Sequence, residues 1–450
     1  MGAWMDLRAV STMLLGLTAV AALAPSAALA DDDQSAPTPQ PFAIHVQFTD
    51  VTQGHPGFAA AFSGPNSLAA DANARATNDV TLYVGVRPWA GGEIWVDPEI
   101  DEGFGLSDTL GVAGFTSGEA YKVGATTPYA KVHRYFLRQT IDLGGEAQKV
   151  EPDLDSLGGS QSANRIVLTV GKFSVVDIFD GNRYAHDPRG DFMNWSLIDT
   201  GSFDYAANAW GYTYGAAAEW YQGAWTLRGG IFDLTNVPNS TDIDYTFQQF
   251  QWVWEAERRF QIAGRPGAIR LTGFLTRGRM AKLADATALA LATGQPANPA
   301  LVRRYAGRPG VSVSADQQLT DDIGVFLRAG VADGRYEAFE FTDIDRTLAA
   351  GVSLAGRRWG RADDTVGLAG VVNEASQDRL SFLAAGGLGI LVGDGRLPHP
   401  GPEGIVESYY SLAVAAYARL SFDYQFIANP GFNRDRGPVS VFGLRLHLER

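Results

Sequence analysis

Segments in which apolar and polar residues alternate follow one another from residue 42 to the end of the chain. Alternation with a period of two is typical of a β-strand whose two faces meet different surroundings. The clearest example is the stretch 208–234, where a glycine-containing turn at Gln222-Gly223 predicts a hairpin in which Trp220 faces Trp225. One face of this hairpin is apolar, with aromatic side chains near the turn, and the other face is polar.

Such hairpins suit either a soluble β-sandwich or a transmembrane β-barrel. The pattern predicts roughly sixteen segments, each near the ten-residue length of a tilted membrane strand. Short connections at 222–223, 320–322 and 363–364 alternate with long ones at 54–78, 234–245, 277–308 and 377–407. Short turns at one rim and long loops at the other are typical of outer-membrane barrels. We therefore expect an all-β, antiparallel transmembrane barrel of about 16 strands.

Composition narrows the function further. The chain has 450 residues, 52 glycines, no cysteine and a net charge of -14. The acidic balance argues against nucleic-acid binding, which needs a basic surface. Beyond the N-terminus no apolar run approaches the roughly 18 residues of a spanning helix. A helical membrane protein and a nucleic-acid-binding protein are thus excluded.

The N-terminus predicts export. Arg8 supplies a basic n-region, Val10 to Leu23 is apolar, and Ala28-Leu29-Ala30 matches a small-x-small cleavage site. We assign residues 1–30 to a signal peptide, residues 31–41 to a polar leader and residues 42–450 to the barrel. A membrane anchor is the alternative for the first segment, although its apolar run is short for a span.

Two inserts interrupt the strand pattern. Residues 280–292 are rich in strong helix formers and predict a helix. Residues 99–122 are glycine-rich and mixed, and either fold into the lumen as a constriction or form an ordinary surface loop.

Short motifs are spread along nearly all of the mature chain. They lie at Trp95–Ile100, Gly103–Ser107, Val170–Ser174, Asp177–Asn182, Asp191–Trp195, Gly211–Trp220, Phe339–Asp343, Gly393–Leu397, Pro402-Glu403, Glu407–Tyr410, Asp423–Pro430 and Asn433–Pro438. Together these motifs resemble those of the carbohydrate-selective porins of the OprB family.

The resemblance implies a 16-stranded barrel in the outer membrane of a Gram-negative bacterium. It implies passive diffusion of sugars, with glucose-type monosaccharides as the family's usual solutes, and neither a cofactor nor covalent chemistry. The expected partners are sugars, outer-membrane lipid and lipopolysaccharide, and the barrel-assembly machinery. Both a monomer and a homotrimer fit the pattern.

A sugar channel needs hydrogen-bond donors and acceptors that bind weakly enough to release the solute. Arginine forks and carboxylates meet this need. For each candidate, the alternative to sugar contact is a cross-strand ladder of ion pairs that stiffens the wall. We predict that the following residues face the lumen: Arg87, Glu93, Trp95, Arg138, Lys172, Glu219, Arg228, Glu255, Arg270 and Arg328, together with Glu257 and Arg419.

Other chemistry has weaker support. The six histidines lack the ligand spacing of a zinc motif. The acidic run 177–191 misses the EF-hand pattern, so we expect a solvated acidic loop. Three alternative functions remain: a general porin, a barrel enzyme built around His447, and a secreted β-sandwich that binds glycans. The enzyme would need a serine and an acid beside that histidine.

Overall fold

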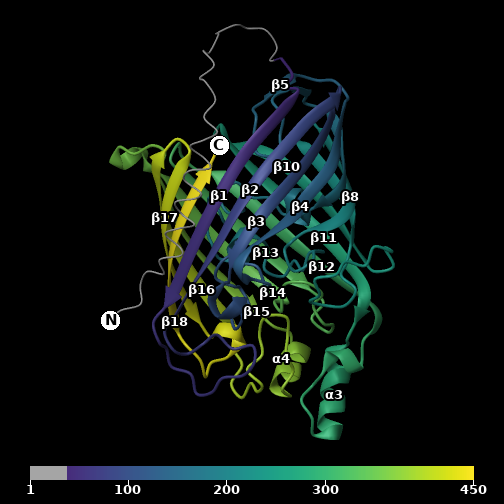
Figure 1. The fold of residues 1–450 in the computed structure, drawn as a ribbon, viewed down its shortest axis with the longest axis vertical. Helices are drawn as coiled ribbons and strands as arrows, with labels where there is room; N and C mark the ends of the chain where they lie inside the picture. The colour runs from purple at the N-terminus through teal and green to yellow at the C-terminus, as the bar shows by residue number, and fades with distance from the viewer. Residues whose placement is uncertain (1–37) are drawn as a thin grey trace.

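A computed structural model describes residues 38–450, so the predicted signal peptide and most of the polar leader lie outside the described residues. Sixteen antiparallel strands close into one barrel, in which β1 pairs with β18 (Figure 1). The predicted fold class is therefore confirmed. The barrel strands are β1 (Phe42–His55), β2 (Asn73–Trp89), β3 (Gly92–Gly103), β4 (Ala125–Asp142), β7 (Arg165–Phe173), β8 (Thr213–Gln222), β9 (Trp225–Asp233), β10 (Phe250–Ile262), β11 (Arg265–Met280), β12 (Arg304–Gln318), β13 (Ile323–Ala332), β14 (Arg346–Ala355), β15 (Thr365–Glu374), β16 (Glu403–Ala415), β17 (Ala418–Ala428) and β18 (Val439–Glu449).

The two ends of the barrel differ. Tight turns at 90–91, 223–224, 263–264 and 416–417 lie at the end where β18 finishes, at the top of Figure 1. The long loops lie at the other end, where α3 (Leu283–Thr293) and α4 (Gln377–Ala384) project. One connection at the turn end is long: residues 143–164 carry a separate hairpin of β5 (Ala147–Val150) and β6 (Gly159–Ser162).

In the part of the chain that the structure describes, helical structure is confined to the connections. The helix predicted at 280–292 is present as α3; it begins at Leu283 because β11 continues to Met280. In residues 38–450 no helix has the length and apolar character needed to cross a bilayer. The remaining short elements are α2 (Trp195–Ile198), η1 (Leu106–Thr109), η2 (Val175–Asp177), η3 (Pro299–Leu301), η4 (Gly356–Trp359) and η5 (Pro430–Phe432).

Alternation along the strands sends apolar side chains outward and polar ones into the lumen, as expected for a barrel in lipid. On β9, for example, Leu227 is exposed on the outer face whereas Thr226 is fully buried on the inner face. Aromatic side chains gather on the outer face near both ends, as in the girdles of membrane barrels. They include Trp89, Trp220, Trp225, Trp359 and Tyr417 near the turns, and Tyr135, Trp252, Tyr305 and Phe442 nearer the loops.

The β8–β9 hairpin turns one residue later than predicted. Gln222 pairs with Trp225, so the turn is Gly223-Ala224 and Trp220 faces Leu227 rather than Trp225. Glycine occupies the first turn position, where φ is +56°. The pairing shifts by two residues, so the inner and outer faces stay as predicted. Glu219 lies directly opposite Arg228 rather than diagonal to it.

Two connections from the loop end fold into the lumen. The first, residues 104–124, turns inward past β2, and Gln53 of β1 and Gln425 of β17 donate to its Thr116 carbonyl at 2.8 and 2.7 Å. Its inward course was one of the two predicted alternatives, although residues 99–103 belong to β3. The second, residues 174–212, was not expected to enter: there Asp180 is fully buried and pairs with Arg328 of β13 at 2.6 Å. The prediction that 177–191 is a solvated acidic loop is therefore wrong for Asp180, whereas Asp177 and Asp187 are exposed.

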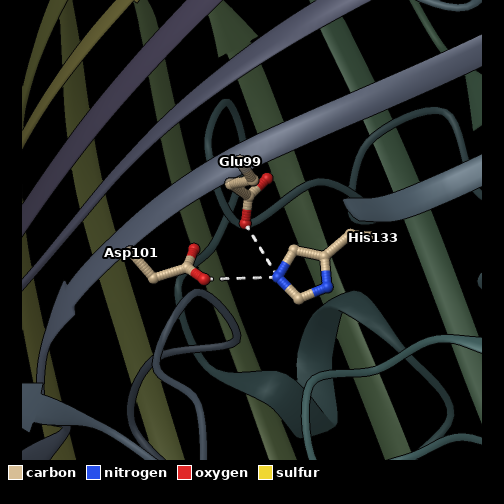
Figure 2. A group of neighbouring side chains, drawn as sticks. All are labelled: Glu99, Asp101 and His133. Carbon is tan, nitrogen blue, oxygen red and sulfur yellow. Dashed lines mark hydrogen bonds and ion pairs between the residues drawn. The ribbon is translucent and has the colours of Figure 1, made fainter. Parts of the chain in front are cut away.

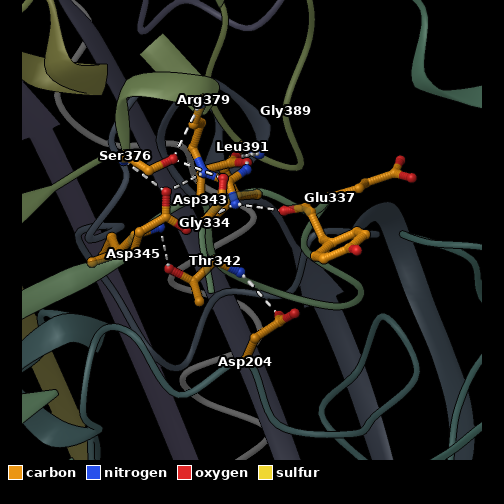
Figure 3. A network of polar contacts seen from close by, with 12 residues as sticks. Asp204, Gly334, Glu337, Thr342, Asp343, Asp345, Ser376, Arg379, Gly389 and Leu391 are labelled. Carbon is orange, nitrogen blue, oxygen red and sulfur yellow. Dashed lines mark hydrogen bonds and ion pairs between the residues drawn. The ribbon is translucent and has the colours of Figure 1, made fainter. Parts of the chain in front are cut away.

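A buried polar network joins this second insert to the loops at the barrel end (Figure 3). The Arg379 guanidinium contacts Asp343 and Asp345 at 2.9 Å each. Arg308 bridges Asp345 and Asp204 at 3.3 and 3.2 Å. The Asp204 carboxylate in turn accepts the backbone N–H groups of residues 339–342. The insert is thereby fixed to the β13–β14 and β15–β16 loops.

Replacing Arg328 with methionine is expected to loosen the second insert. The change leaves the buried Asp180 carboxylate without its partner, which costs about 3–5 kcal/mol. Limited trypsin digestion should then cleave after Arg183 or Arg189, both in this insert. The matched control is Arg346→Met, which removes an exposed arginine 3.7 Å from Glu374. Equal digestion of the two variants would contradict the claim that the Arg328–Asp180 pair holds the second insert in place.

Candidate functional site

A chamber of about 280 Å³, lined by charged, aromatic and aliphatic side chains, remains where the two inserts approach the barrel wall. The wall contributes Tyr83 of β2 and Arg134 of β4, the first insert Glu119, the second insert Arg189, and the turn-end connection Asp155. Residues from five separate parts of the chain therefore line one chamber in the lumen, and each is placed by a strand, an anchored insert or the turn-end connection.

The Arg134 guanidinium forms one charged pair of the chamber. It binds Asp177 through two parallel hydrogen bonds of 2.9 and 2.8 Å, and Asp155 lies 3.8 Å away. A two-pronged contact of this kind fixes the plane of the guanidinium. The group also lies over the Tyr212 ring, 4.9 Å from its centre. About a tenth of the Arg134 side chain, 11%, stays exposed.

The Arg189 guanidinium forms the second pair. It binds Glu119 at 2.9 Å, and the carboxylates of Asp79 and Glu99 lie 3.9 and 4.0 Å away. Its side chain is 13% exposed. The chamber therefore presents two arginines, each next to carboxylates, rather than a field of one sign.

Aromatic side chains complete the wall. Trp195 stacks on Phe115 with ring centres 5.1 Å apart, which ties the second insert to the first. Tyr83 donates to Gln47 at 2.9 Å, and Trp210 donates to Tyr129 at 3.1 Å. These rings are packed among neighbours, so they shape the chamber.

Three of the predicted lumen residues face inward but meet the turn-end connection. Arg87 donates to the carbonyls of Gly158 and Leu157 at 3.2 and 3.1 Å and binds Glu93 at 3.0 Å. Arg138 donates to the Asp155 carbonyl at 2.6 Å and also reaches Glu93. This cluster holds residues 155–158 inside the turn-end mouth, and it brings Asp155 to the chamber.

Glu219, Arg228, Glu255, Glu257 and Arg270 form a continuous ladder across β8 to β11. Arg228 contacts Glu219, Glu255 and Glu257 at 3.0, 2.6 and 3.0 Å. Arg270 contacts Glu257 at 3.1 Å and extends the ladder to Asp316 of β12 at 2.7 Å. These contacts match the wall-stiffening alternative, and they leave the side chains of Arg228 and Arg270 only 10% and 13% exposed.

The remaining predicted residues lie elsewhere. Trp95 points inward but is fully buried, and a methyl group at Gly85 would overlap its ring. Arg328 is fully buried against the second insert, and Arg419 donates to the Asp363 carbonyl in a turn. The prediction for Lys172 is wrong. Its neighbours in register are the outward-facing Tyr135 and Tyr214, and its ammonium binds the Val132 carbonyl on the outer side.

The chamber residues themselves were absent from the prediction. Alternation could have found Arg134, which shares the parity of Arg138 on β4. No pattern in the sequence shows that Glu119, Asp177 and Arg189 enter the lumen, because they lie on irregular inserts. His447 contacts Thr49 at 3.2 Å and Glu449 at 3.3 Å, so an acid is present, but no serine lies among these partners.

A closed barrel with inward inserts and a charged chamber defines the class of porins. Residues 65–449 match the model of the carbohydrate-selective porins, OprB family. The chain therefore belongs to this family and is an outer-membrane porin. The predicted family and location are confirmed, and both family and fold are those of channels.

Solved structures show the same fold. The high-pH structure of OprB from Pseudomonas putida is 17% identical, with a TM-score of 0.67 over 91% of this chain and 94% of that chain. Its low-pH structure is 12% identical, with a TM-score of 0.50 over 91% and 93%. The outer membrane channel DcaP of Acinetobacter baumannii is 11% identical, with a TM-score of 0.50 over 91% and 97%. No curated protein matches the chain.

Asp199, which lines the chamber from the second insert, makes the folding stability depend on pH. Burial raises the pKa of its carboxyl to about 8, and the neighbouring Asp180 carboxylate adds to the rise. A raised folded-state pKa favours the protonated form, so folding stability falls as pH rises from about 4, the unfolded value, and levels off above about 8. Asp199→Asn removes this loss.

We expect the stability gain of Asp199→Asn to grow between pH 5 and pH 8, by at most about 1.4 kcal/mol per pH unit. Thermal melts followed by circular dichroism across this range measure the difference. A gain that stays constant with pH would contradict the raised pKa.

Proposed function

We propose that this porin conducts neutral monosaccharides of the glucose type by passive diffusion, and that the Arg134–Asp177 and Arg189–Glu119 pairs contact the passing sugar. The observation that carries the proposal is the chamber, where both charged pairs line one small space between the inserts and the wall. Solutes that cross the lumen on this side meet donors and acceptors together.

The charges favour neutral polar solutes. A lone arginine or a lone carboxylate would attract ions of the opposite sign. Here each guanidinium already has a carboxylate within 3.0 Å, so the attraction for a free ion is largely cancelled. Sugar hydroxyls both donate and accept, and they can use the N–H groups and oxygens that the pairs leave free.

The binding this arrangement offers is weak, as conduction requires. The two guanidinium side chains are 11% and 13% exposed, so only a few of their donors reach the chamber. Rings such as Trp195 and Tyr83 are packed against protein and give shape, not open stacking faces.

The earlier lumen candidates take supporting roles in this proposal. Arg87, Glu93 and Arg138 hold the turn-end connection, and the ladder from Glu219 to Asp316 stiffens the wall. The outer apolar face is the surface for outer-membrane lipid and lipopolysaccharide. Insertion by the barrel-assembly machinery and a homotrimer stay predictions.

Current block by glucose in planar bilayers tests the proposal. Arg134→Met should weaken the block about tenfold, because one charge-assisted hydrogen bond is worth roughly 1.5 kcal/mol or more. The matched control is Arg270→Met, which also removes one lumen arginine with two carboxylate partners.

We expect the control to keep the block within about twofold, since Arg270 does not line the chamber and distant sites with no shared partner act independently. If glucose blocks both variants as strongly as it blocks the wild type, the chamber does not contact the sugar. A wild-type channel that glucose does not block at all would favour a general porin.

A further inference from the structure

A histidine and two carboxylates converge at one point beside the chamber. His133 Nε2 lies 3.3 Å from Asp101 Oδ2 and 3.6 Å from Glu99 Oε1 (Figure 2). All three side chains are about 1% exposed. Figure 2 shows them pointing toward one another from neighbouring strands, with both carboxylates aimed at the same ring nitrogen. One N–H can satisfy only one of these two oxygens at a time.

A β-bulge brings the histidine into this position. Asp97 pairs with Arg134, but the next residue, Pro98, pairs with Val132, so His133 is the extra residue of β4. Proline has no N–H to give to the ladder, and inside a sheet it is found at bulges. Because a bulge re-aims a side chain, His133 and Arg134 both turn into the lumen although they are adjacent in sequence.

The spacing of the three atoms fits a tetrahedral metal ion. Zinc binds histidine nitrogen and carboxylate oxygen at about 2.0–2.2 Å, which places neighbouring ligand atoms about 3.3–3.5 Å apart. The two measured separations are 3.3 and 3.6 Å, and the third ligand pair also lies within 4.8 Å. Only small side-chain movements would be needed to enclose an ion.

The surrounding charge also points to a cation at this place. Asp79, Glu99, Asp101 and Glu119 are all less than 5% exposed, yet among residues 38–450 Arg189 is the one guanidinium paired with any of them. Buried carboxylates in such excess are costly unless protons or a cation neutralise them.

We propose that Glu99, Asp101 and His133 bind a divalent transition-metal ion of the zinc class, with a fourth position open to water. The imidazole ligand favours this class over calcium and magnesium, which prefer oxygen ligands. Access is from the chamber, whose lining residue Tyr121 donates a hydrogen bond to Glu99.

The ion would join β3 to β4 and fix the chamber wall. His133 stacks on Tyr212 with ring centres 4.5 Å apart, and Tyr212 lies under the Arg134 guanidinium. A metal-bound imidazole would therefore hold the ring on which one charged pair rests. This inference is independent of the proposed sugar, because metal uptake can be measured without transport.

The test uses the full-length protein in detergent, stripped with a chelator and dialysed against Zn²⁺ at neutral pH. Elemental analysis should find about one zinc per folded chain in the wild type. His133→Gln should lower zinc affinity about tenfold or more, since even the loss of a group supporting a ligand costs that much. Excess Ca²⁺ or Mg²⁺ should not displace the zinc.

The matched control is His399→Gln, which alters an exposed histidine that pairs with Asp435 alone and should leave zinc uptake unchanged. Asp101→Asn serves as a second variant, and circular dichroism checks that each barrel is folded. Zinc uptake that is equal in the wild type, His133→Gln and Asp101→Asn would overturn the proposal. A folded wild type that takes up no zinc would overturn it as well and would assign the neutralising charge to protons.

Discussion

The interior depends on carboxylates of the barrel wall that accept backbone N–H groups of the inserts. Glu403 and Glu407 both point inward from β16. Glu403 accepts the N–H groups of Ala113 and Gly114 at 2.9 and 2.7 Å, and Glu407 accepts that of Asn194 at 2.9 Å. Hydrogen bonds to charged groups are worth about 1.5–3 kcal/mol each. One strand thus anchors both inserts inside the barrel, where they form two sides of the chamber.

The barrel itself could be predicted because its cause is local. The two-residue alternation decides which side chains meet lipid, and a register error of two residues in β8–β9 left every face as predicted. The course of the inserts could not be predicted, since their partners are distant wall residues and backbone groups. Asp180 is an acidic residue in a loop by sequence, and only the fold places Arg328 beside it.

The site was predicted less well than the wall for the same reason. Charge was taken as a sign of an inward position, which failed for Lys172 because a long basic side chain can bind a carbonyl at the outer rim. The inward position of the residues in the ladder around Arg228 was predicted, but their contacts stiffen the barrel wall. Pro98 was a usable signal: a proline inside a strand indicates a bulge, and the bulge turns His133 inward.

The most direct test of this account is swelling of liposomes that contain the purified protein, with glucose, a disaccharide, an amino acid and a charged solute of similar size compared side by side. Paired charges in a small chamber predict fast entry of glucose and slow entry of the charged solute and the amino acid at equal size. Entry rates that depend on solute size alone would contradict the account, because the charged pairs would then serve only to hold the inserts.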